Sequence, residues 1–203
     1  MASRETEPIL GLHLGAKTKG SSALVLEHFR RGAEQAGSGM EIFSSAGREI
    51  EGCRACGSCD TTGRCVIEDG MEPIYEALEK ASRIVISAPV YFYGLPSQGK
   101  ALVDRVQIFW ARQYKLRQKR TFSRPPQGLV LSLGATKGQD LFTPVILCTK
   151  YFFDSLEFPK KFPFVGFRKI ETPADLTSEQ LALAERCGRD FASDPFMADP
   201  AWS

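Results

Sequence analysis

The sequence predicts a doubly wound α/β domain, in which a five-stranded, mostly parallel sheet has helices on both faces. Short apolar runs alternate with longer segments of helical periodicity, and no repeat or linker interrupts the alternation. The composition, 43% hydrophobic and 25% charged, is typical of globular proteins and excludes disordered and fibrous classes. We therefore expect one domain over residues 1–203, with a cysteine-rich insertion at about residues 52–66.

The first part of the chain predicts a strand, a helix and a second strand. Residues 8–14 form an apolar run before a glycine-containing turn, which is typical of a strand buried on both faces. Apolar side chains then follow a helical period from residue 21 until the Gly-Ser-Gly stop at residues 37–39. Residues 40–46 predict a second, shorter strand.

The middle of the chain predicts two helices and two strands. Residues 71–78 have a helical period in which Pro73 is tolerated only in the first turn. Residues 83–90 are rich in β-branched side chains and predict the central strand. A single helix from residue 95 to about residue 119 and a strand at residues 128–133 follow.

The last part predicts a helix at residues 141–156, a strand at residues 162–167 and a final helix. Prolines interrupt that strand, so we place it at an edge of the sheet. Thr177 and Gln180 have the spacing of a capping box at the start of the final helix.

Four cysteines fall within thirteen residues in a C-x2-C-x2-C-x5-C pattern. They are Cys53, Cys56, Cys59 and Cys65. The N-terminus lacks an apolar signal core and no stretch is long and apolar enough to span a membrane, so we expect a cytoplasmic protein. In that reducing compartment, close cysteines favour metal ligands or redox thiols over structural disulfides. The isolated Cys148 and Cys187 are predicted to be small core residues.

Ligands of doubly wound sheets bind beyond the carboxyl ends of the strands, which directs attention to the loops after Leu14, Pro89 and Leu133. The first loop, residues 15–22, supplies glycines, two lysines, hydroxyls and the free N–H groups of a helix start, which together suit a single phosphate. It lacks the P-loop and G-x-G-x-x-G patterns, which argues against a nucleoside triphosphate or Rossmann dinucleotide site. A solvated polar turn is the alternative interpretation.

The second loop carries a family resemblance. Residues 88–105, APVYFYGLPSQGKALVDR, resemble the "SPVYFGS…K…DR" stretch of the NADPH-dependent FMN reductase family of flavodoxin-like proteins. The third loop, residues 134–140, resembles the glycine-rich segment that flanks the isoalloxazine in that family. The cysteine pattern resembles that of its iron–sulfur flavoproteins, whose four thiolates hold a four-iron cluster. Zinc on four thiolates and unmetallated or disulfide-forming thiols remain open alternatives.

The phosphate loop departs from the family pattern G-S-P-R-x-x-G-N-[ST]. Lys17 keeps a cation at the arginine position, and Gly20 and Ser22 match the pattern. Gly15 and Ser21 replace its serine and asparagine. We expect weaker phosphate binding, because lysine grips a phosphate as a point charge and not as a bidentate fork.

The resemblance implies a set of residues that contact FMN and a set that hold the cluster. The implied flavin contacts are Gly15, Lys17, Gly20, Ser21, Ser22, Pro89, Val90, Tyr91, Phe92, Tyr93, Gly94, Gly134, Ala135, Thr136 and Gly138. The implied cluster ligands are Cys53, Cys56, Cys59 and Cys65. His13, at the end of the first strand, is interpreted as a near-core histidine with satisfied hydrogen bonds, and the alternative is a histidine that approaches the ligand.

The predicted function is that of an FMN-dependent oxidoreductase, which takes electrons from reduced nicotinamide, NAD(P)H, or from a redox protein partner. The resemblance also implies a homo-dimer or tetramer. The alternative is a non-catalytic zinc-binding or interaction module that has lost flavin binding. The net charge of +2 gives no reason to expect nucleic acid or a membrane as partner, and the basic run at residues 112–124 is interpreted as a solvated helix end and loop.

Overall fold

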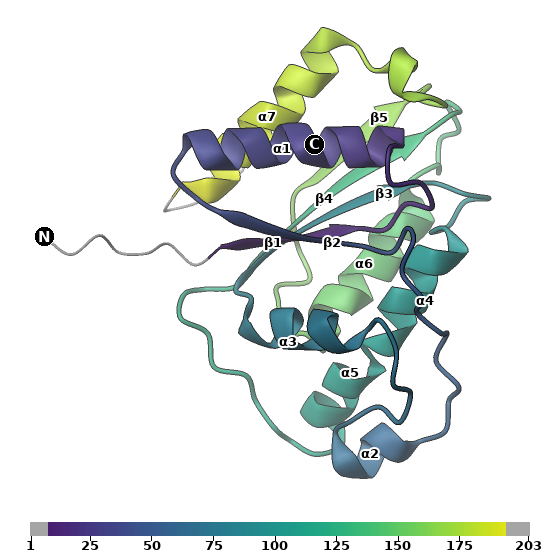
Figure 1. The fold of residues 1–203 in the computed structure, drawn as a ribbon, viewed down its shortest axis with the longest axis vertical. Helices are drawn as coiled ribbons and strands as arrows, with labels where there is room; N and C mark the ends of the chain where they lie inside the picture. The colour runs from purple at the N-terminus through teal and green to yellow at the C-terminus, as the bar shows by residue number, and fades with distance from the viewer. Residues whose placement is uncertain (1–7, 194–203) are drawn as a thin grey trace, which may run out of the picture.

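A computed structural model describes residues 8–193 and contains one five-stranded parallel sheet with the strand order β2-β1-β3-β4-β5 (Figure 1). The strands are β1 Ile9–His13, β2 Met40–Ser44, β3 Arg83–Pro89, β4 Gln127–Gly134 and β5 Phe164–Arg168. The predicted flavodoxin-like doubly wound fold is therefore confirmed. The prediction of a single domain over residues 1–203 extends beyond the described residues and stays a prediction.

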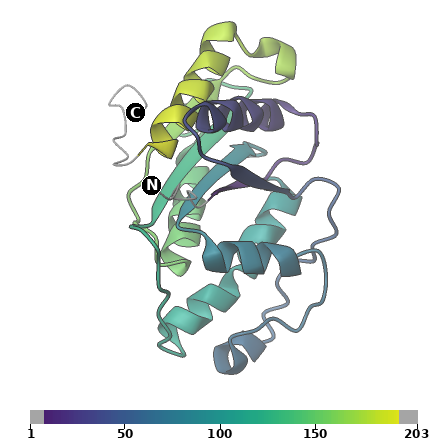
Figure 2. The same ribbon diagram turned by 60° about the vertical axis from the view of Figure 1, so that its left-hand side comes forward.

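Helices cover both faces of the sheet (Figures 1 and 2). One face carries α1 Ser21–Gln35 and α7 Ser178–Ala192. The other face carries α3 Glu72–Lys80, α4 Ser97–Arg105, α5 Gln107–Tyr114 and α6 Thr143–Ser155. The short helix α2 Ser58–Thr62 lies in the cysteine-rich segment, and a 3-10 turn, η1 Pro173–Asp175, follows β5.

The central strands are apolar on both faces because each face has its own core. Ile84 and Ile86 pack into the core under α3 to α6, whereas Val85, between them, packs under α1 and α7. Leu10 of β1 is in register with Ile84, and Leu12 is in register with Ile86. This double burial explains why these strands appear in the sequence as continuous apolar runs.

Helices α1 and α7 approach so closely that glycine is required where they cross. A Cβ atom on Gly32 would lie 1.8 Å from the Glu185 carbonyl oxygen, and one on Gly188 would lie 1.9 Å from that of Phe29. The predicted capping box at the start of α7 is confirmed. The Gln180 N–H donates to Thr177 Oγ1 at 3.2 Å.

One predicted helix and one predicted core residue need correction. The single helix over residues 95–119 is wrong: α4 ends at Arg105, a tight turn at Val106 redirects the chain, and α5 ends at Tyr114. The turn lets residues of both α4 and α5 pack into the core under the sheet, while α5 also contacts α2 and α6. Cys187 is buried as predicted, but Cys148 is only half-buried, because it lines a surface hollow between α6 and the α4–α5 turn.

Candidate functional site

A pocket of about 360 Å³ opens at the carboxyl edge of the sheet, where the loops after β1, β3 and β4 meet. This volume lies within the usual range for small-molecule sites. The predicted flavin contacts that line this edge pocket are Lys17, Gly20, Ser21, Ser22, Pro89, Val90, Tyr91, Gly134 and Ala135. The structure therefore brings residues from all three loops to one place.

Other predicted contacts lie outside the lining. They are Gly15, Phe92, Tyr93, Gly94, Thr136 and Gly138. Gly15 is buried beneath the pocket, against His13 and Ser22. A Cβ on Gly138 would lie 2.4 Å from the hydroxyl oxygen of Tyr93, so the second and third loops touch each other beside the pocket.

One wall of the edge pocket was missed by the sequence analysis. The segment after β5 contributes Ile170, Glu171, Thr172 and Pro173. The predicted site contained only the loops after β1, β3 and β4, although the parallel strand β5 also ends at this edge. The T-x-x-D spacing of Thr172 and Asp175 was available as a local indication, since it forms a capping box around η1.

The first turn of α1 faces the pocket with free main-chain donors. Its N-cap is Gly20, which provides no side-chain cap, so the first N–H groups of α1 have no side-chain acceptor from that position. Ser21 and Ser22 at this end line the pocket, together with the cations Lys17 and Lys19. Unpaired N–H groups, the helix dipole and two ammonium groups favour an anionic group here.

His13 lies beneath this phosphate loop and is almost completely buried. Its Nε2 lies 2.9 Å from Ser22 Oγ, and its Nδ1 lies 2.8 Å from Ser44 Oγ at the end of β2. Burial lowers the pKa of His13 to about 4, so the imidazole is neutral at pH 7. The interpretation of His13 as a satisfied buried histidine is confirmed.

Residues 91–94 form a tight turn at the end of β3. The Tyr91 N–H donates to the Gly94 carbonyl and the Gly94 N–H donates to the Tyr91 carbonyl, each at 2.9 Å. The central residues, Phe92 and Tyr93, have φ values of 47° and 56°, a region that bulky L-residues rarely adopt. Phe92 is fully exposed and Tyr93 is half exposed. A strained turn thus presents two aromatic rings to solvent beside the edge pocket.

All four clustered cysteines line a second hollow of about 470 Å³, here called the cysteine pocket. Cys53 and Cys56 are exposed, while Cys59 and Cys65 are half-buried. Within residues 8–193, no three Cys, His, Asp or Glu side chains converge closely enough to hold one metal ion. The thiols therefore surround an open space and do not meet at one point.

The guanidinium of Arg105 fixes both ends of the cysteine-rich segment. Its Nη1 donates to the Glu51 carbonyl at 3.1 Å, and its Nη2 donates to the Ile67 carbonyl at 3.0 Å. The same group pairs with Asp69, and its Nε donates to the Tyr75 hydroxyl at 3.1 Å. Since Arg105 also lines the cysteine pocket, one cation from α4 holds the loop that carries the four thiols.

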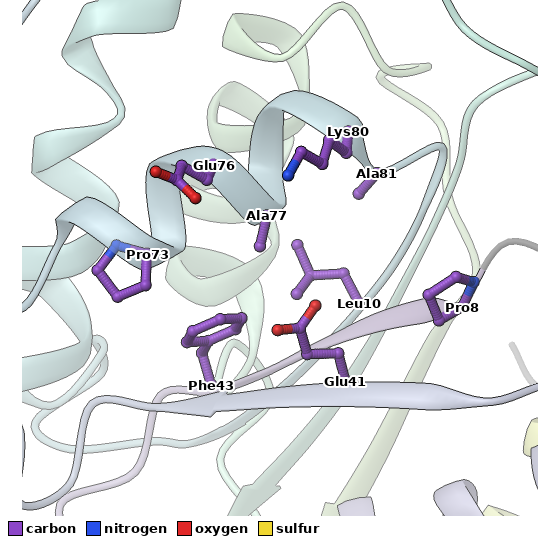
Figure 3. Close-up of a pocket in the computed structure, with 9 residues that line it drawn as sticks. All are labelled: Pro8, Leu10, Glu41, Phe43, Pro73, Glu76, Ala77, Lys80 and Ala81. Atoms are coloured by element: carbon purple, nitrogen blue, oxygen red, sulfur yellow. The ribbon is translucent and has the colours of Figure 1, made fainter.

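A third hollow, of about 390 Å³, lies between α3 and the β1–β2 edge (Figure 3). Phe43 and Glu41 point from β2 toward α3, and Ala77 points back toward them (Figure 3). The hollow extends to Pro8, before the start of β1, and lies away from the carboxyl edge of the sheet. We therefore assign it no part in the candidate site.

The basic run at residues 112–124 is partly absorbed by the fold. Arg112 Nε donates to the Gly63 carbonyl at 2.8 Å, and Arg120 donates to the carbonyls of Leu156 and Leu78, each at 2.6 Å. These two cations therefore stabilise the loops around α2 and α3.

No helix in the described part of the chain has the length and apolarity needed to cross a membrane.

A parallel sheet of this order, with a ligand-sized pocket at its carboxyl edge, defines a flavodoxin-like α/β protein. The family model described as NADPH-dependent FMN reductase matches residues 8–140. The chain belongs to this family of oxidoreductases. The resemblance inferred from the second loop is thereby confirmed.

The chain is also similar in sequence to proteins named iron-sulfur flavoproteins. An iron-sulfur flavoprotein of Methanosarcina thermophila is 33% identical over 105 residues, which cover 52% of this chain and 51% of that protein. An iron-sulfur flavoprotein of Archaeoglobus fulgidus is 30% identical over 135 residues, which cover 66% of each chain. The matched part spans less than two thirds of either relative.

Solved structures show the same fold at low sequence identity. The NAD(P)H:quinone oxidoreductase from Methanothermobacter marburgensis has a TM-score of 0.64 at 16% identity, covering 91% of this chain and 99% of that one. An FMN-dependent NADH-azoreductase from Bacillus anthracis, solved in complex with FMN, has a TM-score of 0.63 at 16% identity, covering 95% and 100%.

Proposed function

We propose that this chain binds FMN in the edge pocket and passes electrons to an acceptor from NAD(P)H or from a protein donor. The observation that carries the proposal is the meeting of three loops and the open N-terminus of α1 in one pocket, in a member of an FMN reductase family. FMN supplies the hydride and electron transfer when it is bound. The residues of the chain bind, orient and shield it.

The phosphate end of FMN fits the first turn of α1. Lys17 and Lys19 supply charge, while Ser21, Ser22 and the main-chain N–H groups supply directed donors. The flavin ring fits between the Pro89–Val90–Tyr91 segment and Gly134, because these main-chain segments form two walls of the same pocket. In this proposal Phe92 and Tyr93 cover the exposed side of the ring.

The four clustered cysteines are proposed to hold a four-iron cluster. Tetrahedral zinc with sulfur ligands at about 2.3 Å requires sulfurs about 3.8 Å apart. The thiols around the cysteine pocket do not converge in this way, which favours a larger group with one thiolate on each iron. The names of the two relatives, both iron-sulfur flavoproteins, support the same assignment.

We also propose that the working unit is a homo-dimer or tetramer. The cysteine-rich segment runs alongside α4 and α5 to α2 at the bottom of the view, away from the loops of the edge pocket (Figure 1). Leu147 and Tyr151 of α6 are 51% and 62% exposed, which suits a surface covered by a second copy. Light scattering of the loaded protein tests this proposal, and a monomer would contradict it.

The first experiment is an absorption spectrum of protein purified without oxygen, with iron, sulfide and zinc analysis. Flavin bands over a broad absorbance that bleaches in air, with about four irons per chain, support the full proposal. A yellow, air-stable protein would support the proposed FMN reductase and contradict the proposed iron–sulfur cluster. A colourless protein that rejects added FMN and contains zinc supports the interaction module.

Two variants sharpen this experiment. Cys59→Ser removes a proposed ligand and is expected to abolish the broad absorbance while the flavin bands remain. Cys187→Ser is the matched control, because Cys187 is buried in α7 on the opposite face of the sheet. NADPH oxidation with added FMN measures whether the flavin reaction survives loss of the cluster.

A further inference from the structure

The phosphate loop differs from the pattern of its family at Gly15, and the structure gives a physical reason for the difference. A Cβ atom on Gly15 would lie 2.5 Å from His13 Nε2 and 2.7 Å from Ser22 Oγ. Both distances are too short for a side chain at this position unless His13 or Ser22 moves. The space above Gly15 is therefore occupied by the hydrogen-bonded pair of His13 and Ser22.

The hydrogen bonds around His13 can form one directed chain. Ser44 Oγ accepts the Ala46 N–H at 3.1 Å, which leaves its own O–H free to donate to His13 Nδ1. A neutral imidazole that accepts at Nδ1 carries its proton on Nε2 and donates it to Ser22 Oγ. The Ser22 hydroxyl proton is then free for an acceptor in the edge pocket.

Ser22 is also held through its main chain. Ser87 Oγ, at the end of β3, donates to the Ser22 carbonyl at 2.8 Å. Ser22 lines the edge pocket although it is only 3% exposed, so few hydroxyl orientations are open to it. A phosphate has only acceptor atoms toward such a hydroxyl, so the direction of the chain decides whether Ser22 attracts or repels it.

We propose that His13 is a positioning residue for the phosphate of the flavin: it holds the Ser22 hydroxyl as a donor, and Gly15 is small because the imidazole needs its space. The inference rests on the proposed FMN site and deepens it. It assigns the preference for FMN over riboflavin, which lacks the phosphate, to the His13–Ser22 pair in addition to the lysines.

The test compares two variants of His13 by titrating flavin-free protein with FMN and with riboflavin. His13→Gln keeps an amide donor near the position of Nε2, whereas His13→Asn is one bond shorter and reaches only the position of Nδ1. We expect His13→Asn to weaken FMN binding by about ten- to a hundredfold, the size of one hydrogen bond to a charged group. His13→Gln should lose less, and riboflavin binding should be equal in both.

Ser22→Ala keeps the inference testable if a His13 variant fails to fold. It removes the hydroxyl and should lower the FMN-to-riboflavin affinity ratio as His13→Asn does. The combination of the two changes should lower the ratio no further, because both break one interaction. Additive losses would overturn the proposal.

A change at Gly15 tests the steric part. Gly15→Ser should weaken FMN binding strongly in the wild-type background, where its Cβ meets the imidazole. The same change should cost less together with His13→Ser, because removing the imidazole relieves the 2.5 Å contact and leaves only the Ser22 hydroxyl to turn aside. Equal losses in the two backgrounds would overturn the link between the two positions.

The outcomes also separate this inference from the proposed function. Wild-type protein that binds neither flavin overturns both. Wild-type protein that prefers FMN, with the same preference in His13→Asn and in Ser22→Ala, overturns the role of His13 alone. A preference that falls in both variants, at unchanged riboflavin affinity, supports it, since a general loss of structure would weaken both flavins.

Discussion

Arg105 Nη1 lies 2.7 Å from Asp69 Oδ2, and the two side chains are only 1% and 9% exposed. The pair joins α4 to the end of the cysteine-rich segment, whose carbonyls at Glu51 and Ile67 accept from the same guanidinium. A buried cation with four partners is a structural anchor, because removing it leaves two carbonyls without its N–H donors. The buried Asp69 carboxylate would keep only the main-chain N–H groups of Glu51 and Met71.

Replacing this anchor should loosen the loop that carries the thiols. Arg105→Met is expected to lower the free energy of unfolding by about 3–5 kcal/mol, the usual loss when one partner of a buried pair is removed. It should also speed the reaction of Cys53 and Cys56 with a thiol reagent. Urea unfolding and the rate of thiol modification measure the two effects.

Lys100→Met is the matched control for this change. Lys100, also on α4, pairs with Asp104 one turn further along the helix, but the two side chains are 50% and 43% exposed. Exposed pairs contribute little, so the control should change stability by less than about 1 kcal/mol. Equal effects of the two substitutions would contradict the anchoring role of Arg105.

The sequence predicted the sheet well because its main determinant is local. Residues 83–90 and 128–133 are apolar without alternation, and only strands covered on both faces have that pattern. The role of Arg105 was not predictable in the same way. Its partners Glu51, Ile67 and Asp69 are more than thirty residues away in the chain, and no local pattern relates them.

The edge pocket was predictable in part. The loops after β1, β3 and β4 were expected to meet, because parallel strands bring their carboxyl ends to one edge. The break at Val106 was missed because residues 100–119 contain no glycine or proline to end a helix. The left-handed turn at Phe92 and Tyr93 was also missed, because glycine stands after these positions and not at them.

His13 should make stability depend on pH. The unfolded chain takes up a proton on this histidine near pH 6.5, whereas burial lowers the pKa in the folded protein to about 4. The unfolded state therefore binds more protons between these values, and the free energy of unfolding falls by about 1–3 kcal/mol as the pH drops from 6.5 to 4. Urea unfolding at pH 7, 6 and 5 measures the slope.

His13→Gln should flatten this slope, because glutamine does not titrate. Asp175 also contributes to the pH dependence of stability, but at lower pH than His13. Hydrogen bonds from the Thr172 and Glu171 N–H groups hold the pKa of Asp175 below its usual value. Its stabilising effect is lost only as the pH falls below about 4. Identical slopes for the wild type and His13→Gln between pH 7 and pH 5 would count against a buried, neutral His13.

The crossing of α1 and α7 should not tolerate a single methyl group. Gly188→Ala places a Cβ where the Phe29 carbonyl oxygen already lies 1.9 Å away, so the helices must separate. We expect a loss of about 3 kcal/mol in the free energy of unfolding. Gly52→Ala is the control, since open space surrounds Gly52, and its effect on a thermal unfolding curve should be small. A stable Gly188→Ala protein would show that the helices are packed less closely.

Replacing the two aromatic residues of the strained turn should raise the stability of the protein and weaken flavin binding. In Phe92→Asn combined with Tyr93→Gly, the two positions with positive φ carry residues that favour such turns, so flavin-free protein should gain about 1 kcal/mol of unfolding free energy. The same change removes both exposed rings and should weaken FMN and riboflavin binding by one common factor, because the two flavins share the ring system. Urea unfolding and titrations with each flavin measure these effects. Unchanged binding of both flavins would show that the aromatic rings serve another ligand.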